Sequence, residues 1–551
     1  MSSSEPSILN AERLFPNQET SSERIAALSL LDAITVNFSD TCAVWLFERP
    51  EPKTQFDLVN HLRQSLGVTL DAYPQWCGLV KAINTVNGPP ATGEDQLAPH
   101  ARRFGRVYVH YGTRSDPGVE FVTARSAATL DELHPSSRPS AQPLWNQEEV
   151  TLSQFVPTTP LANPANVSDV DILPPNMAIQ VTELACGGFV LAVKIAHTLA
   201  DASAMISFVK DWANVSRSVS QGEAPPVLNP VFEPERLDNA AAGDINAALP
   251  EESIIQQTES LPFHRYDWWN VPADSPRKKQ IPSIFRNQEL PPAGKQIPWS
   301  EWDTNAPVSH YIVHLSQDQV EAIWKQASNA SSADAKDSRL SRHDAVLAHI
   351  WASINRARNM QQDPGPVHCD LTYGCRPAFQ LGDAFMGSLA VMVNVEMTGA
   401  DVTTTAQSDG KETAVLPPIA QRIRQTLSRV RDPVLLAAHL HRLAYEVSPQ
   451  RIWQGFLGSR HVMTTTWARA GLYEVDFGLG PHPTARYADG ILSNLDGLVL
   501  IKEAPPGRRS EATGKASPTW TQHGVDVQLH VRTEDMERLL LDPLLLPHQH
   551  E

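Results

Sequence analysis

From residue 187 to residue 196, in the segment GGFVLAVKIA, a row of large apolar residues alternates with a period of two with a row of smaller or polar ones: Phe189, Leu191, Val193 and Ile195 alternate with Val190, Ala192, Lys194 and Ala196. Such alternation places one row of side chains on each face of a sheet. After Asp201 the apolar residues recur at helical spacing, which gives one inward-facing stripe of Met205, Ile206, Val209, Trp212 and Ala213. The pattern predicts a buried strand that leads into His197 and a helix that begins after Asp201.

The same two periods predict further elements along the chain. Strands are expected at 43–48, 106–111, 118–124, 177–184, 310–315, 367–373, 389–396, 462–467 and 525–531. Helices are expected within 56–73 and at 316–327, 341–358, 419–430 and 534–541. We interpret 106–111 and 118–124 as two strands of a meander, and 177–184 as the hairpin partner of the strand before His197. Residues 1–25 are expected to form a flexible or lightly docked tail.

Length and periodicity divide the chain into two halves. A chain of 551 residues is too long for one ordinary core. The hydrophobic period disappears in the proline-dense part between about 226 and 305, where the aromatic cluster at 266–269 suggests an anchor point. We therefore predict an α/β protein with domains at 1–225 and 306–551, each a mixed sheet with flanking helices, joined by a long crossover segment at 226–305.

Composition excludes several classes of partner. The 45 basic and 62 acidic residues give a formal net charge of −17, which argues against nucleic acid or an anionic membrane. An anionic cosubstrate would need a local basic mouth, for which Arg277-Lys278-Lys279 and Arg508-Arg509 are candidates, although such short runs are usually solvated loop charges.

With no apolar run near the ~20 residues of a membrane span and no signal-like N-terminus, we expect a cytoplasmic monomer. Five scattered cysteines indicate reduced thiols.

His197 and Asp201 form a His-x-x-x-Asp pattern at the strand–helix junction. A histidine fixed at the end of a buried strand is well placed to act as a general base. The pattern alone is weak, because a core histidine with a satisfied hydrogen bond or a surface pair would give the same letters.

Other kinds of chemistry find little support in the sequence. The chain contains no Gly-x-Ser-x-Gly elbow, so a serine nucleophile of that type is not expected. The pairs His439-x-His441 and His548-x-His550 lack further ligands at metal spacing, so no metal site is predicted. No permanently bound cofactor is predicted either.

With His197-Thr-Leu-Ala-Asp201 and the later segment DFGLG at 476–480, the chain resembles the BAHD-type acyl-CoA-dependent acyltransferases. That family carries His-x-x-x-Asp-Gly near its middle and Asp-Phe-Gly-Trp-Gly near its end. Weaker blocks resemble it in the same order: LSLLD at 28–32, LRQSLGVTLDAYPQWCGLV at 62–80, SRHDAVLAHIWASINRAR at 341–358, TYGCRP at 372–377 and TTTWARAGLYEVDFG at 464–478. The length and insertions are similar to those of fungal members that act on specialised metabolites.

The resemblance implies a fold and a reaction. The fold is a pair of chloramphenicol-acetyltransferase-like domains. The reaction is transfer of an acetyl or other short acyl group from acyl-CoA, as cosubstrate, to a hydroxyl of a small molecule, with no covalent acyl-enzyme. It also implies a role for each matching residue: His197 as general base, Asp201 paired with Arg376 to hold the histidine loop, Asp476, Gly478 and Gly480 as a structural turn, and Thr466 and Trp467 on the CoA side.

Two residues depart from the family pattern. Ala202 replaces the glycine after the aspartate, which disfavours a positive φ at that point. Leu479 replaces the tryptophan of the second motif. The alternatives are an N-acyltransferase of the same family and a non-catalytic descendant that binds a metabolite. A condensation domain that uses carrier-bound acyl groups is disfavoured, because Ala196 occupies the place of its second histidine.

Overall fold

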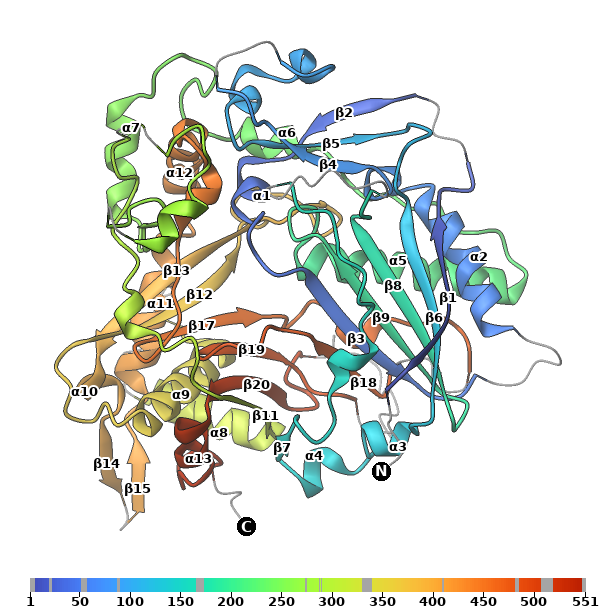
Figure 1. The fold of residues 1–551 in the computed structure, drawn as a ribbon. Helices are drawn as coiled ribbons and strands as arrows, with labels where there is room; N and C mark the ends of the chain where they lie inside the picture. The colour runs from blue at the N-terminus through green and yellow to red at the C-terminus, as the bar shows by residue number, and fades with distance from the viewer. Residues whose placement is uncertain are drawn as a thin grey trace.

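Two large mixed sheets with flanking helices form the frame of the molecule (Figure 1). The computed structural model describes residues 5–18, 22–50, 57–86, 90–164, 173–272, 275–286, 288, 290–329, 339–408, 411–480, 485–506 and 519–547. The first sheet has the order β1 (Ser7–Leu14), β6 (Val119–Ser126), β8 (Met177–Leu184), β9 (Phe189–Ile195), β3 (Thr41–Phe47) and β18 (Tyr487–Gly490). The second has the order β13 (Ala390–Thr398), β12 (Pro366–Gly374), β17 (His461–Thr466), β19 (Leu498–Glu503), β20 (Val525–Arg532), β11 (Val308–Leu315) and β7 (Leu144–Asn146).

Each sheet takes an edge strand from the other half of the chain. β7 belongs to the N-terminal half but pairs with β11 of the second sheet. β18 belongs to the C-terminal half but pairs with β3 of the first sheet. The two halves are therefore joined by backbone hydrogen bonds as well as by side-chain packing, and the boundaries at 225 and 305 stay a prediction.

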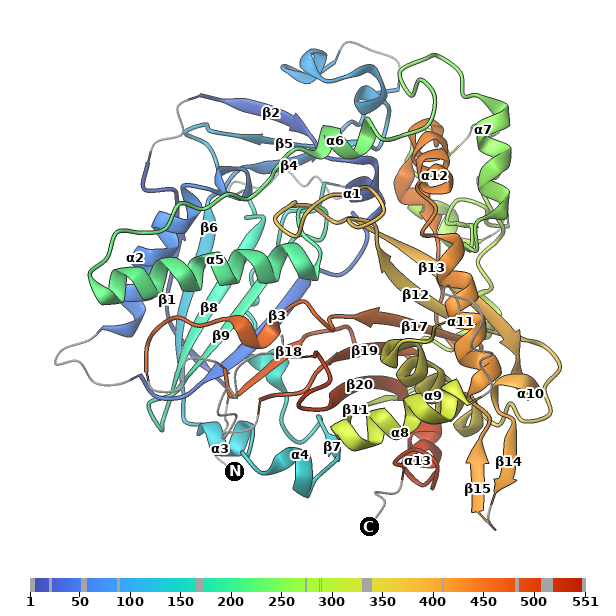
Figure 2. The same cartoon turned by 180° about the vertical axis from the view of Figure 1, so that it is seen from behind.

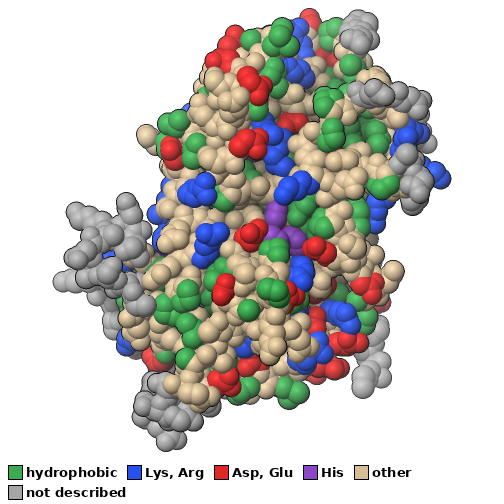
Figure 3. All heavy atoms as spheres, turned by 90° about the vertical axis from the view of Figure 1, so that its left-hand side faces the viewer, with side chains coloured by type: hydrophobic (Ala, Val, Ile, Leu, Met, Phe, Trp, Pro, Cys, Tyr) green, Lys and Arg blue, Asp and Glu red, His purple; other side chains and the backbone are tan. Residues whose placement is uncertain are grey.

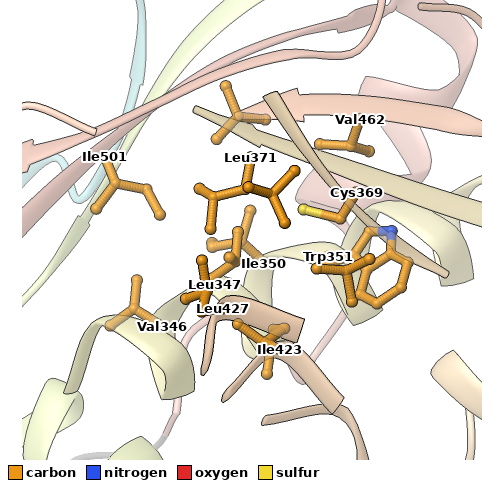
Figure 4. Close-up of a cluster of buried hydrophobic side chains, with 14 of the residues drawn as sticks. Val346, Leu347, Ile350, Trp351, Cys369, Leu371, Ile423, Leu427, Val462 and Ile501 are labelled. Atoms are coloured by element: carbon orange, nitrogen blue, oxygen red, sulfur yellow. The ribbon is translucent and has the colours of Figure 1, made fainter. Parts of the chain in front are cut away.

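Amphipathic helices bury their apolar stripes on the sheets, as the helical spacing predicts. The first sheet carries α2 (Leu58–Leu70) and the long α5 (Ala202–Gln221). The second carries α8 (Gln317–Ser328), α9 (Arg342–Ala357), α11 (Pro417–Arg429) and α13 (Thr533–Leu540). Figure 4 shows the core between α9, α11 and the strands β12 and β17, where Trp351, Ile423 and Cys369 meet. Four of the five cysteines are buried, and all five are free thiols.

Two predictions about the N-terminal half are wrong. β5 (Val107–Tyr111) lies in a separate sheet with β2 (Arg24–Ala27) and β4 (Leu79–Ala82), while β6 runs parallel to β8, so β5 and β6 form no meander. Two glycines with positive φ, Gly112 and Gly118, bound the link that carries the chain from one sheet to the other. Ser7–Leu14 is no tail but the edge strand β1; its mostly exposed side chains hide it from periodicity analysis.

The crossover segment contacts both halves of the chain, since Asp238 pairs with Leu30 and His100, and its aromatic cluster anchors it on the C-terminal half. It contains α6 (Pro234–Asp238), α7 (Glu252–Gln257) and β10 (Tyr266–Asp267), and β10 pairs with β16 (Ile452–Trp453). Trp268 stacks on Trp453 with 4.9 Å between ring centroids, and Asp267 is buried in an ion pair with Arg451. The remaining elements are α1 (Leu30–Ile34), α3 (Leu130–Leu133), α4 (Arg138–Ala141), α10 (Gly399–Val402), α12 (Pro433–Tyr445), β14 (Thr405–Ser408) and β15 (Lys411–Ala414). Among the described residues, no helix is both long and apolar enough to cross a bilayer.

Candidate active site

His197 lies where the two halves of the molecule meet. It follows β9, whose side chains are almost all buried, so the backbone that carries the imidazole is fixed. Its Nδ1 is 2.8 Å from the Oγ of Ser388, which belongs to the segment between β12 and β13 of the second sheet. The ring of Phe38 packs edge-on against the imidazole at 5.4 Å between centroids. One face of the half-buried imidazole and one of its nitrogens are thus positioned by groups from both halves of the chain.

Ser388 is itself held by Asp32. The backbone N–H of Ser388 donates to Asp32 Oδ1 at 2.6 Å. Asp32 also closes a capping box with Ser29 at the start of α1, and it accepts hydrogen bonds from the N–H and hydroxyl of that serine. Burial raises the pKa of the Asp32 carboxyl to about 6, even though the hydrogen bonds from Ser388 and Ser29 lower it. A helix cap of the N-terminal half therefore supports the serine that contacts His197.

Asp201 and Arg376 form a two-pronged ion pair behind the histidine loop. Arg376 Nη1 donates to Asp201 Oδ2 at 2.6 Å and Arg376 Nη2 donates to Asp201 Oδ1 at 3.0 Å. Asp201 is also the N-cap of α5 through the N–H of Ala204, and it accepts from the N–H of Leu389 at 3.2 Å. The structure thus brings together the two residues that the family resemblance pairs. With both oxygens engaged in this way, the carboxylate is an acceptor in a fixed network rather than a partner of the imidazole.

The other contacts of Arg376 fold the β12–β13 segment over the histidine loop. Its guanidinium donates to the carbonyl oxygens of Phe385 and Gly387, at 3.0 and 2.9 Å. Figure 2 shows this segment reaching from the tips of β12 and β13 towards α1 and the N-terminal end of α5. One arginine therefore ties the segment that carries Ser388 to the residue that begins α5.

The surroundings of His197 favour its neutral form. Burial lowers the pKa of the imidazole below its ordinary value of 6.5, and the negative charge of Asp201 opposes this only in part. A neutral imidazole has one unprotonated nitrogen with which to accept a proton. Since Nδ1 faces Ser388, Nε2 is the nitrogen left for a substrate.

Ala202 causes no strain at the turn. It is the first residue of α5, directly after the N-cap Asp201. Asn359, Gln380 and Arg469 are the non-glycine residues with positive φ in the described chain, and Ala202 is not among them. Alanine is a good helix former, so the family glycine is not needed for this backbone.

The segment DFGLG lies at the far end of α5, about 24 Å along the helix from Asp201 at the usual rise per residue. Asp476 accepts from Arg217 in the last turns of α5, at 3.2 Å, and caps its own turn through the N–H of Gly478 at 2.8 Å. Gly478 has a φ of +69° and packs on the backbone and side chain of Arg217, so a side chain there would be strained and would clash. Leu479 and Gly480 line a small pocket beside Phe47, Arg49 and Phe189. This geometry is that of a structural turn.

Thr466 and Trp467 come at the end of β17. The Thr466 hydroxyl donates to the carbonyl of Ile501 at 3.4 Å, and this residue is half-buried. Trp467 is 5% exposed and its ring packs against Gly490 of β18. The structure gives Trp467 the contacts of a core residue, while Thr466 keeps an accessible side.

Three of the other candidate side chains, His439, His441 and Arg277, contact groups of the protein itself. His439 Nε2 contacts the amide of Gln454, and His441 contacts the carbonyl of Ala242 and the N–H of Glu251. Arg277 lies over the ring of Trp299. Arg508, Arg509, His548 and His550 lie outside the described residues.

Sequence reasoning did not assign site roles to Ser388 and Asp32. Asp32 had a readable signal, because Ser29-x-x-Asp32 before an apolar run is a capping-box pattern. Ser388 had no such signal, because a single serine in a loop reaches His197 only when the two halves of the chain fold together.

Comparison with known proteins gives consistent matches over most of the chain. The model of the Transferase family matches residues 113–501. "Acyltransferase AFT15-1" of Alternaria alternata is 26% identical, with 98% of this chain and 96% of that protein covered. "Acyltransferase abl6" of Leptosphaeria maculans is 24% identical, with 98% of each covered.

Solved structures share the fold at low sequence identity. The F. graminearum TRI101 complex with coenzyme A and deoxynivalenol matches with a TM-score of 0.61 at 17% identity, over 94% of this chain and 98% of that one. Vinorine synthase matches with a TM-score of 0.54 at 18% identity, over 98% and 97%. The fold is therefore the two-domain chloramphenicol-acetyltransferase-like architecture that the family resemblance implies.

Proposed function

Since this chain belongs to the BAHD acyltransferases, a membership shown by the Transferase family match over residues 113–501, we propose that it moves a short acyl group from acyl-CoA to a hydroxyl of a small specialised metabolite. The two fungal acyltransferases that align over nearly its whole length support acyl transfer, and the TRI101 complex with deoxynivalenol supports a small-molecule acceptor. The TRI101 structures with coenzyme A and with ethyl coenzyme A support the CoA thioester as donor. Acetyl is the first acyl group to test.

The observation that carries the proposal is the positioning of His197. Its Nδ1 contacts Ser388, its ring is wedged against Phe38, and its lowered pKa keeps it neutral. His197 Nε2 takes the proton of the acceptor hydroxyl as the oxygen attacks the thioester carbonyl. The tetrahedral intermediate then collapses, the carbon–sulfur bond breaks, and the CoA thiolate leaves with the proton from the imidazolium.

A covalent acyl-enzyme is not part of this proposal. Ser388, the hydroxyl in contact with His197, is completely buried and faces Nδ1. Burial raises the pKa of the Cys369 and Cys375 thiols to about 12, so neither supplies a thiolate near neutral pH. The direct route needs only the base and two bound substrates.

An acyl-CoA panel tests the proposal. The purified protein is incubated with acetyl-CoA and longer acyl-CoAs, each with a set of hydroxylated and amine-bearing metabolites, and free CoA thiol and acylated product are measured. Acceptor-dependent thiol release with an ester product supports the proposal. An amide product would make the enzyme an N-acyltransferase, and binding without turnover across the panel would favour a non-catalytic descendant. Intact-mass measurement with acyl-CoA alone is expected to show no acyl adduct.

Ser388→Ala should lower kcat without removing activity. The substitution deletes one hydrogen bond to the imidazole, which is worth about 1 kcal/mol, so we expect a loss of roughly fivefold. KM for acyl-CoA should stay unchanged, because Ser388 acts through His197. The matched control is Ser493→Ala, whose exposed hydroxyl contacts Ser39. An unchanged kcat in Ser388→Ala would contradict the positioning role.

The pH dependence of kcat/KM should follow the titration of His197. A base must be neutral, so activity is retained above its pKa and is lost as the pH falls through it. Because burial lowers that pKa, the midpoint of the acid limb is expected below 6.5. Asp32 has a pKa of about 6 and could give a similar limb, so Asp32→Asn is the control. The limb should persist in that variant, and its disappearance would assign the titration to Asp32.

A further inference from the structure

A second cluster of polar side chains lies on the second sheet, outside the site of His197. Asp370 is at the middle of β12, His461 is the first residue of β17, and His264 comes from the crossover segment. His264 Nε2 is 3.3 Å from Asp370 Oδ1, and His461 Nδ1 is 3.1 Å from Asp370 Oδ2. No two of the three donor atoms lie more than 4.8 Å apart. Three segments far apart in the sequence therefore place their donor atoms around one point.

The two atoms that face each other across this point, Asp370 Oδ1 and His264 Nε2, are in contact at 3.3 Å but lack good hydrogen-bond geometry. In the described part of the chain, neither Asp370 Oδ1 nor His264 Nε2 has a hydrogen-bond partner, although both are buried. The Asp370 side chain is 0% exposed. Buried polar atoms are nearly always paired, so a buried carboxylate oxygen whose 3.3 Å contact with an imidazole nitrogen lacks good hydrogen-bond geometry is open to a further ligand.

Neighbouring groups orient the three side chains. His461 turns its second nitrogen, Nε2, towards Glu301 at 3.6 Å. Metal-bound imidazoles commonly direct their other nitrogen to a carboxylate, which fixes the ring and its tautomer. The N–H of Phe456 donates to Asp370 Oδ2 at 3.0 Å, and the ring of His368 stacks on His461 at 4.5 Å between centroids. On the face that carries β12 and β13, histidine side chains reach the surface with acidic side chains beside them (Figure 3).

We infer that His264, Asp370 and His461 bind one divalent transition-metal ion, with Zn²⁺ as the best match. Two imidazole nitrogens and one carboxylate oxygen suit Zn²⁺, whereas Mg²⁺ and Ca²⁺ prefer oxygen ligands alone. Ligand atoms of a tetrahedral zinc lie about 3.3 Å apart, which matches the separation of His264 Nε2 from Asp370 Oδ1. The ion would fasten the crossover segment to β12 and β17, with water as its fourth ligand. The expectation of no metal considered only neighbouring histidines such as His439 and His441, whereas these ligands meet only in the folded chain.

The test is titration of chelator-treated full-length protein with ZnCl₂ by calorimetry, and with CoCl₂ by visible absorption. We expect one ion per chain, a tetrahedral Co²⁺ spectrum, and a rise in melting temperature with Zn²⁺, because an ion that binds the native state stabilises it. Asp370→Asn should abolish this binding, and Glu301→Gln should weaken it about 10–100-fold. His310→Gln, which changes a histidine on β11, is the matched control and should bind as the wild type does.

Two results would overturn the site. One is the absence of Zn²⁺ binding by the wild type, which would leave His461 as a histidine between the carboxylates of Asp370 and Glu301. The other is equal binding by the wild type and Asp370→Asn, which would place the ion elsewhere. Should Asp370→Asn fail to fold by circular dichroism, Glu301→Gln decides, since its side chain is 35% exposed. None of these measurements depends on acyl transfer.

Discussion

Replacing His197 with alanine should lower turnover by about 10²–10⁴-fold, the usual contribution of a positioned general base. This corresponds to about 3–5 kcal/mol of transition-state stabilisation. The loss should fall on kcat, because the proton moves only as the tetrahedral intermediate forms, and KM for acyl-CoA should change little. Steady-state kinetics of thiol release against both substrates measures the effect. His197→Gln should be similarly impaired, since an amide cannot take up the proton.

The control for His197→Ala is His110→Ala, a histidine of β5 whose imidazole contacts Glu23 at 2.6 Å. Both variants should keep the circular dichroism spectrum of the wild type. The imidazole of His197 contacts Ser388 and takes no part in the ion pair of Asp201 and Arg376, so its removal leaves that pair in place. Turnover that is unchanged in a folded His197→Ala protein would remove this residue from the role of base.

The strongest periodic signals predicted the fold well. The strand before His197 and the helix after Asp201 appear as β9 and α5, and the capping box at Ser341 begins α9. These elements bury an apolar face, which the sequence must encode at fixed spacing. Elements that bury little or are very short gave no such signal: β1 is an exposed edge, and β7 has three residues. Strand exchange between the sheets could not be read from the chain, because pairing depends on distant partners.

The candidate site likewise contains some residues that the sequence could reveal and others that it could not. His197 and Asp201 could be singled out from their place at one strand–helix junction, and Arg376 only through the resemblance of TYGCRP to a family block. Ser388 lies 191 residues after His197 in the sequence, and Asp32 lies 356 residues before Ser388. The cluster of His264, Asp370 and His461 is another such case, since local spacing carries no information on segments brought together by folding.

Asp201→Asn is expected to act on stability first and on turnover second. Asp201 is 14% exposed and Arg376 is 8% exposed, so removing one charge leaves the other largely buried without its counter-ion. Breaking such a pair costs about 3–5 kcal/mol. The cap of α5 through the N–H of Ala204 weakens as well. A marked fall in melting temperature should therefore accompany any loss of activity.

The experiment compares Asp201→Asn, Arg376→Met and the double variant by thermal unfolding, with kcat measured well below the lowest transition. The loss of stability in the double variant should be smaller than the sum of the losses in the two single variants, because both single variants break the same pair. Asp383→Asn, an exposed carboxylate of the same β12–β13 segment, is the matched control and should unfold as the wild type does. If Asp201→Asn keeps the wild-type melting temperature yet loses turnover, then Asp201 takes part in proton transfer with His197. If stability and turnover fall together in both single variants, Asp201 is the brace that keeps the base in position.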